Sequence, residues 1–139
     1  MSGLHQFTAV SVKGRGLLIE GAPGSGKSSL ALALIDRGAM LVGDDGVSLA
    51  ALNGRLLAGP APATEGLLEV RNVGLVPMPY VDSAAIALVI ALDPEAPRFI
   101  EAAEERDVLG LRLPLVRLWP GNAVLALRAE LALERYGIG

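Results

Sequence analysis

A single motif near the N-terminus constrains this 139-residue chain more than any other feature. Residues 21–28 read Gly-Ala-Pro-Gly-Ser-Gly-Lys-Ser, which fits the Walker A pattern G-x-x-x-x-G-K-[ST]. Residues 16–20 before it are typical of a short buried strand, and residues 29–37 after it predict a helix that ends at Gly38. A strand, a glycine-rich loop and a helix in this order predict a site that holds phosphate groups.

The residue types of the loop each suit that task. Glycines let backbone N–H groups turn inward around phosphate oxygens, and the helix N-terminus adds the positive end of its dipole. We expect Lys27 to reach the β- and γ-phosphates and the Ser28 hydroxyl to hold Mg²⁺. A glycine-rich turn without a ligand is the weaker alternative, because a strand and a helix flank the loop. The residues predicted to bind the nucleotide are Gly21, Ala22, Pro23, Gly24, Ser25, Gly26, Lys27, Ser28 and Ser29.

Composition excludes several other classes of protein. A hydrophobic content of 52% with 19% charged residues indicates a globular chain, and residues 1–139 suffice for one domain with a core of its own. A net charge of −3 disfavours nucleic acid as a partner. The absence of cysteine rules out disulfides and thiolate metal sites and is compatible with the cytoplasmic location that we expect. No apolar run reaches the ~18 residues that span a bilayer, so no membrane partner is expected.

Short strands separated by turns predict an α/β fold, a mixed β-sheet with few helices. The first two strands are joined by a tight turn and should pair antiparallel, and Asn53-Gly54 predicts a hairpin. Residues 59–64 predict a loop, residues 98–109 carry apolar side chains at roughly helical spacing, and Asn122 is a candidate cap for a closing helix. The strands expected are residues 7–12, 16–20, 39–43, 47–52, 55–58, 67–74, 84–92 and 113–119, and the closing helix covers residues 123–136.

Acidic residues follow two of these strands. Asp44 and Asp45 end an apolar strand, where a carboxylate beside a phosphate loop can bind Mg²⁺ or accept a proton from an attacking hydroxyl. A plain Asp-Asp-Gly turn is the alternative. Asp93 also follows an apolar strand and resembles the metal-holding Asp of a Walker B strand, although an Asp before Pro94 commonly starts a turn.

Three further residues are candidates from their chemistry. Glu69 and Arg71 are two positions apart in an expected strand and would face the same side, where they could serve Mg²⁺ and phosphate or form a surface ion pair. His5 is the only histidine and could tune a catalytic acid, although an exposed terminal residue is the simpler interpretation.

Taken together, these segments resemble the catalytic domain of HPr kinase/phosphorylase. His5 precedes the phosphate loop at nearly the distance found in that family, and Asp44-Asp45 resembles its strand with paired aspartates. Residues 68–74 resemble its E-x-R-G-x-G signature, and residues 113–137 resemble its last strand and helix. The likeness covers nearly the whole chain.

The resemblance implies an ATP-dependent kinase that uses Mg²⁺ and phosphorylates a serine of an HPr-like phosphocarrier protein of the phosphotransferase system. It implies a homo-oligomer, because the catalytic domains of the family assemble into hexamers. It implies that Asp44 is the proton acceptor, that Asp45 supports the site and that His5 lies near Asp44. It also implies that Lys27 and Arg71 contact the phosphates and that Ser28 and Glu69 bind Mg²⁺.

Four departures from the family pattern refine this expectation. The chain resembles a short form found in some proteobacteria, which is expected to lack the usual N-terminal domain, and Asn72 replaces a glycine of the signature. Residues 75–83 form a shorter loop without Lys or Arg, and Asn122 stands where an Arg is expected. These changes favour the kinase reaction over reverse phosphorolysis. The alternatives are a nucleotide-sensing module without transfer activity, which the short loop favours, and a small-molecule P-loop kinase, which would need an Arg-rich lid.

Overall fold

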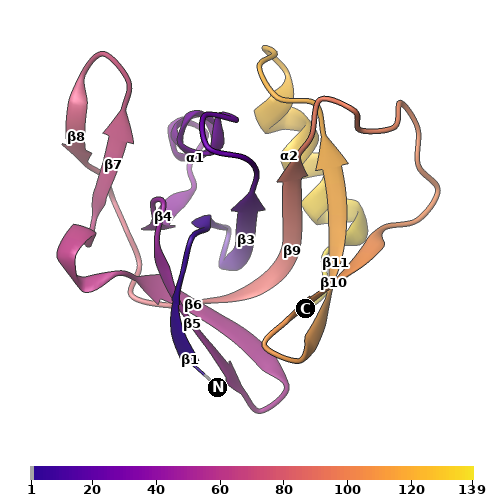
Figure 1. The fold of residues 1–139 in the computed structure, drawn as a ribbon, viewed down its shortest axis with the longest axis horizontal. Coiled ribbons are helices and arrows are strands. Elements are labelled where there is room, and N and C mark those ends of the chain that lie inside the picture. The colour runs from indigo at the N-terminus through magenta and orange to yellow at the C-terminus, as the bar shows by residue number, and fades with distance from the viewer. Residues whose placement is uncertain (1) are drawn as a thin grey trace.

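The longest strand, β9 (Ala84–Leu92), is the axis of the fold in the computed structural model, which describes residues 2–139 (Figure 1). The first two residues of β9 pair antiparallel with β6 (Arg55–Pro60). Its remainder runs parallel between β3 (Arg15–Glu20) and β11 (Leu111–Leu118). A strand with neighbours on both sides and covered on both faces is expected to be continuously apolar, as β9 is.

The other elements extend this arrangement into a mixed sheet of nine strands. Seven of them follow the order β1-β5-β6-β9-β3-β2-β4, and the remaining two are β11, which also pairs with β9, and β10, which pairs with β11. β7 and β8 form a separate two-stranded sheet. The predicted α/β fold with a mixed sheet and few helices is confirmed. The remaining bounds are β1 Ser2–His5, β2 Thr8–Val12, α1 Lys27–Asp36, β4 Met40–Gly43, β5 Val47–Leu52, the 3₁₀ turn η1 Pro62–Thr64, β7 Leu67–Val70, β8 Gly74–Pro77, β10 Glu104–Val108 and α2 Leu125–Tyr136.

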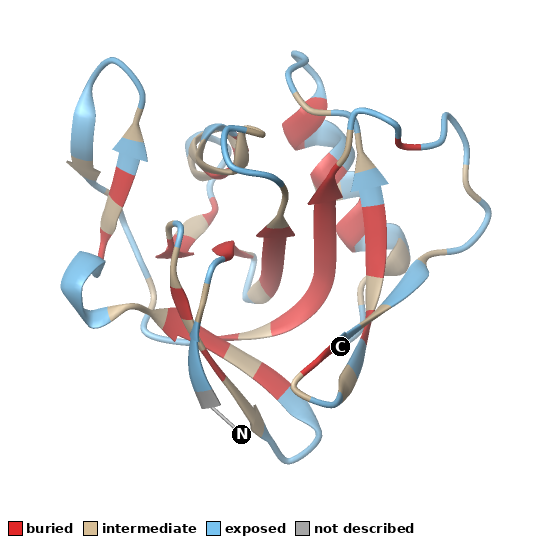
Figure 2. Ribbon diagram, in the orientation of Figure 1, coloured by how far each residue is buried: buried red, intermediate tan, exposed pale blue. Residues whose placement is uncertain are grey.

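The core lies on both faces of the central strands (Figure 2). Successive strand residues point to opposite faces, so Leu17 and Ile19 of β3 pack with α1 and α2, whereas Leu18 packs on the side of β5 and β6. All three side chains are fully buried. Burial of one such side chain contributes about 1.5–3 kcal/mol, so this layering holds the end of β3, and the loop that follows it, in place.

Several local predictions are confirmed. β2 and β3 pair antiparallel, and α1 follows the glycine-rich loop and ends just before Gly38. Asn53 and Gly54 join β5 to β6 with positive φ angles of 53° and 76°, as a two-residue hairpin turn requires. The closing helix is α2, but it begins at Leu125 with Val124 as its N-cap residue and without a side-chain cap, so the cap expected at Asn122 is wrong. Asn122 Oδ1 instead accepts a hydrogen bond from the Val124 N–H in the turn before the helix.

The helix expected in residues 98–109 is wrong. This segment contains the strand β10, which pairs with β11 through a two-residue turn of Leu109 and Gly110, with φ of 50° and 80°. Ion pairs from Arg106 to Glu20 on β3 and from Glu104 to Arg117 on β11 hold its charged side chains. Long-range pairing therefore overrides the apolar spacing of the sequence.

The single strand expected in residues 67–74 is also wrong, because β7 and β8 form a hairpin around residues 71–73. Arg71 lies in the turn, so the inference that it shares a strand face with Glu69 does not hold. Asn72 has φ of 70°, a left-handed conformation that Asn tolerates better than most residues, which explains how it replaces a glycine.

The end of β6, the 3₁₀ turn η1 and the strand β1 were not predicted. β6 continues to Pro60, and η1 occupies part of the loop expected in residues 59–64. Residues 2–5 form β1, which pairs with β5 and carries His5 to the edge of the sheet nearest Asp44 and Asp45. Neither α1 nor α2, the two α-helices of residues 2–139, is long and apolar enough to cross a membrane.

Candidate active site

The glycine-rich loop connects the buried end of β3 to the first turn of α1 and lines a cavity of about 360 Å³, here called the phosphate cavity. The Ser25 N–H donates to the Ala22 carbonyl at 2.9 Å, which closes a tight turn. Gly24 and Gly26 have φ of 79° and 103°, and an added Cβ at Gly26 would meet no atom within 4 Å. These glycines are needed for backbone conformation, which leaves the inner side of the loop open to a ligand.

Lys27 lies along this loop. Its side chain is only 13% exposed, and Nζ donates to the Gly21 carbonyl at 3.3 Å and lies 3.8 Å from Asp45 Oδ1. The Ser25 hydroxyl is buried and has no hydrogen-bond partner among the described residues. A phosphate group would supply an acceptor for such donors, so the residues present fit a phosphate ligand.

Asp44 is the most constrained acidic residue of the site. Its Oδ1 accepts hydrogen bonds from the Ser28 hydroxyl at 2.6 Å and the Thr8 hydroxyl at 3.2 Å. Its Oδ2 accepts the Glu69 N–H at 2.8 Å. Both oxygens of this half-buried carboxylate are therefore engaged, by residues from α1, β2 and β7.

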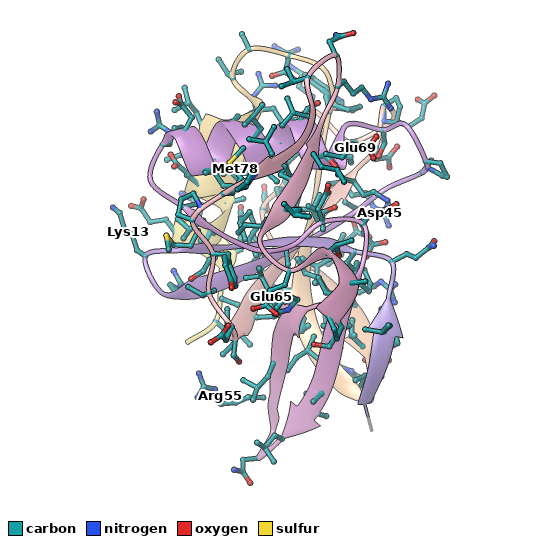
Figure 3. All side chains as sticks on the ribbon, turned by 90° about the vertical axis from the view of Figure 1, so that its left-hand side faces the viewer. Lys13, Asp45, Arg55, Glu65, Glu69 and Met78 are labelled. Atoms are coloured by element: carbon teal, nitrogen blue, oxygen red, sulfur yellow. The ribbon has the colours of Figure 1, made fainter. Side chains whose placement is uncertain are left out.

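Asp45 is placed differently. Its side chain is 67% exposed, and it points to the same side of the molecule as Glu69 (Figure 3). Its φ of 49° is left-handed, and its N–H donates to the Thr8 hydroxyl at 3.1 Å. The carboxylate thus stands between Lys27 and open solvent, without the three hydrogen bonds that occupy Asp44.

A second cavity of about 550 Å³ adjoins the first, and we call it the carboxylate cavity. His5, Asp44, Asp45 and Glu69 line it, and Asp45, Glu69 and Gln6 line both cavities. The structure thus brings His5 and the two aspartates to one place, as the sequence resemblance predicts. Arg71, from the β7–β8 turn, lines the phosphate cavity beside the loop.

A divalent cation has few protein ligands here. No cluster of three or more His, Asp or Glu side chains with metal-binding geometry occurs in residues 2–139. Asp44 accepts hydrogen bonds from the Ser28 hydroxyl and the Glu69 backbone N–H, and the Glu69 residue lines the phosphate cavity together with Ser28. Hydroxyl and carboxylate oxygens suit Mg²⁺, which usually binds one or two carboxylates, waters and substrate phosphates. The donor set therefore fits Mg²⁺ bound together with a phosphorylated ligand.

Asp93, the competing candidate from the sequence, lies elsewhere. Its Oδ1 accepts the Glu95 N–H at 2.8 Å in a turn, and its Oδ2 lies 3.4 Å from Arg117. It lines neither of the two cavities. These contacts favour a structural role in the turn after β9.

Sequence reasoning missed two residues of the site. Thr8 is fully buried and contacts both aspartates, and Gln6 lies at the boundary of the two cavities. A threonine at the start of a strand that is mostly Ala and Val was the available signal, because a hydroxyl that becomes buried needs a hydrogen-bond partner. The sequence alone does not show that the partners of the Thr8 hydroxyl are Asp44 and the Asp45 N–H, because they lie 36 and 37 positions away.

Comparison with known proteins shows the family to which the chain belongs. Residues 3–117 match the family model described as HPr Serine kinase C-terminal domain. The chain is 34% identical to HPr kinase/phosphorylase of Clostridium tetani and 37% identical to that of Clostridium novyi, in each case over 93% of this chain and 47% of the relative. The chain thus spans about half the length of the curated relatives it matches.

A solved structure shows the same fold. The Hpr(Ser) kinase/phosphatase from Coxiella burnetii superposes with a TM-score of 0.85 and 25% sequence identity, over 95% of this chain and 94% of that one. The family model covers most of the present chain, and it includes the phosphate loop, both aspartates and Glu69. The chain belongs to the HPr serine kinase C-terminal domain family.

Proposed function

We propose that this chain is a serine kinase that transfers the γ-phosphoryl group of ATP to an HPr-like phosphocarrier protein. The observation that carries the proposal is the contact between the Ser28 hydroxyl and Asp44 beside Lys27, at the start of a helix that follows a glycine-rich loop. Family membership and the names of the relatives support the serine acceptor and the HPr-like partner.

Lys27 and the loop neutralise charge on the transferred group. Phosphoryl transfer needs in-line positioning and compensation of negative charge more than covalent participation by the protein. The backbone of residues 21–26 and the Lys27 ammonium provide that compensation. Mg²⁺, held by Ser28 and Glu69 with Asp44 behind Ser28, would add further positive charge at the phosphates.

The contacts favour Asp45 over Asp44 as the proton acceptor. The resemblance in the sequence implied Asp44 for this role, yet both oxygens of Asp44 are occupied by Ser28, Thr8 and the Glu69 N–H. Asp45 is exposed in the carboxylate cavity and lies next to Lys27. We therefore assign Asp45 to the serine hydroxyl and Asp44 to the orientation of Ser28 and Mg²⁺.

Other features of the proposal follow from the resemblance. His5 lies in the carboxylate cavity and would orient the acceptor, and Arg71 would contact the phosphates. The short segment after β8 and Asn122 in place of an arginine favour kinase activity over phosphorolysis. Assembly into a homo-oligomer such as a hexamer, and a cytoplasmic location, complete the proposal.

The test is transfer of label from γ-labelled ATP with Mg²⁺ to purified HPr-type proteins of the same organism. Wild type, Lys27→Ala and Lys13→Ala are compared, since these are the chain's two lysines and Lys13 lies in the β2–β3 turn, away from the cavities. We expect label on a serine, lost in Lys27→Ala and kept in Lys13→Ala. Absence of label while ATP still binds would instead support the nucleotide-sensing module.

A further inference from the structure

A cavity of about 290 Å³ lies at the opposite end of β3 from the glycine-rich loop, and we call it the arginine cavity. β3 begins at Arg15, which lines this cavity, and ends at Glu20, directly before the loop. Among residues 2–139, none lines both the arginine cavity and either the phosphate cavity or the carboxylate cavity. The arginine cavity is therefore a separate site, which the proposed kinase reaction does not use.

Three arginines from three separate hairpins line the arginine cavity. Arg15 and Arg55 begin β3 and β6, and Arg112 is the second residue of β11. Among the described residues, no acidic side chain lines the cavity. Figure 3 shows Arg55 on the β5–β6 hairpin, away from Asp45 and Glu69. Because the chain as a whole has a net charge of −3, this local excess of positive charge distinguishes the cavity from the rest of the molecule.

The guanidinium group of Arg15 is held against the end of α2. Its Nη1 donates to the Leu133 carbonyl at 3.3 Å, and its Nη2 donates to the Ile138 carbonyl at 3.1 Å. Gly137 leaves room for this arrangement, because an added Cβ at that position would lie 2.7 Å from Arg15 Nη2. The Nε atom of Arg15 is buried and has no hydrogen-bond partner within residues 2–139. Since buried donors normally have an acceptor, this N–H group is suited to an acceptor from a ligand.

The positive charge of the cavity has little compensation from the protein. Neither Arg15 nor Arg55 forms an ion pair with a carboxylate of residues 2–139. Arg112 lies 3.5 Å from Glu105 and 3.7 Å from Asp107, but all three side chains are exposed, and exposed pairs are weak. Guanidinium groups bind carboxylate and phosphate groups through paired N–H donors. The charges therefore favour an anionic ligand.

The inner wall of the arginine cavity is apolar. Leu56, Ile86, Ala87 and Leu113 line it, and each is at most 4% exposed. They lie on β6, β9 and β11, and β9 pairs with both of the other strands, so this wall is rigid. Pockets of about 300–1,000 Å³ hold drug-sized ligands, so a cavity at the lower end of this range suits a ligand with only a few carbon atoms.

We propose that the arginine cavity binds a small organic anion. Its carboxylate or phosphate group would contact Arg15 and Arg55, and its short hydrocarbon body would cover the apolar inner wall. Arg112 would add a third positive charge at the rim. Binding at this site does not depend on the proposed function, because no residue of the phosphate cavity takes part.

NMR spectroscopy of the isotope-labelled chain tests the proposal, because the Arg15 Nε–H group gives a signal of its own. The probes are butyl phosphate, butyrate, inorganic phosphate and butanol, titrated in the absence of ATP. Arg55→Gln and Arg112→Gln each remove one charge at an exposed position of the cavity. Arg98→Gln is the matched control, because Arg98 is exposed and does not line the cavity. Lys27→Ala reports whether binding in the phosphate cavity moves the signal.

We expect a saturable shift of the Arg15 Nε–H signal with butyl phosphate and with butyrate, and none with butanol. Butyl phosphate should bind about threefold or more tightly than inorganic phosphate, because only the ester covers the apolar wall. Arg55→Gln and Arg112→Gln should each weaken binding about fivefold or more. Arg98→Gln and Lys27→Ala should change the dissociation constant by less than about twofold. The tighter ligand of butyl phosphate and butyrate identifies the anionic group that the cavity prefers.

Three results would overturn the proposal. The first is an unshifted Arg15 signal with both organic anions, or butanol that binds as tightly as butyrate. The second is an equal loss of affinity in Arg55→Gln and Arg98→Gln, because the attraction would then be a general effect of charge. The third is a shift that disappears in Lys27→Ala, which would place the anion in the phosphate cavity instead.

Discussion

The Ser28 hydroxyl donates a 2.6 Å hydrogen bond to Asp44 Oδ1 and so ties the first turn of α1 to the end of β4. Together with the Thr8 hydroxyl and the Glu69 N–H, Ser28 takes three of the about four acceptor positions of this carboxylate, which leaves it less room for a second hydroxyl. The neighbouring Asp45 has the freedom that Asp44 lacks.

Asparagine substitutions separate the two roles. Asp45→Asn should lower the rate of serine phosphorylation about 100-fold or more and leave ATP affinity nearly unchanged, because it removes only the proton acceptor. Asp44→Asn should raise the Mg²⁺ concentration required for half-maximal activity, because Ser28 loses its charged partner. Steady-state kinetics at varied Mg²⁺ checks both. Full activity in Asp45→Asn with none in Asp44→Asn would return the acceptor role to Asp44.

Thr8 is a positioning residue for this pair. Its hydroxyl donates to Asp44 and accepts the Asp45 N–H, and the residue is fully buried. Thr8→Val should lower the free energy of unfolding by about 1–3 kcal/mol, because two polar groups lose their partner. It should also reduce kcat with little change in KM for ATP. Urea unfolding and kinetics measure these effects.

Thr8→Ser is the control for that experiment, since it keeps the hydroxyl. It should restore most of kcat. A Thr8→Val enzyme with normal kcat and lowered stability would show that Thr8 serves only the fold.

The central strand should tolerate truncation poorly. Leu88 of β9 is fully buried between the sheet and the helices, and Leu88→Ala should cost about 2–5 kcal/mol of unfolding free energy through lost burial and a residual cavity. Leu131→Ala on α2, where the side chain is 63% exposed, should change it by less than about 0.5 kcal/mol. Denaturant midpoints compare the two. Similar losses in both variants would contradict the layered core described above.

The contact between Tyr80 and Glu65 should depend on pH. Its hydroxyl donates to Glu65 Oε1 at 2.8 Å, and this hydrogen bond, with the charge of Glu65, raises the pKa of Tyr80 above its usual value of 10.0. A raised pKa in the folded state means that the contribution of this contact is complete below about pH 10 and is lost as the pH rises through the folded-state pKa.

Absorbance titration of Tyr136→Phe, which leaves Tyr80 as the one tyrosine, measures that pKa. Glu65→Gln in the same background should move the pKa of Tyr80 back toward the usual value, because the amide has no charge to oppose the phenolate. An identical titration in the two proteins would exclude the Glu65 contact in solution.

Signals within short segments allowed the phosphate loop, its flanking strand and helix, the β5–β6 hairpin and β9 to be predicted from the sequence. Each depends on residues within about ten positions of one another, where glycine conformations and apolar runs act directly on the local backbone. The charged strand β10 was not predicted, because its pairing with β11 and the ion pair from its Arg106 to Glu20 on β3 join residues that are distant in the sequence.

The sequence by itself determined that a glycine-rich loop of the Walker A pattern and paired aspartates occur in an α/β fold, because those patterns are local and their chemistry is specific. Only the tertiary structure decided what each aspartate contacts. Thr8, Ser28 and Glu69 come from β2, α1 and β7 and meet at Asp44 through the pairing and packing of those elements. Hydrogen bonds between residues 16 to 36 positions apart depend on how the whole chain packs, and no segment encodes them alone.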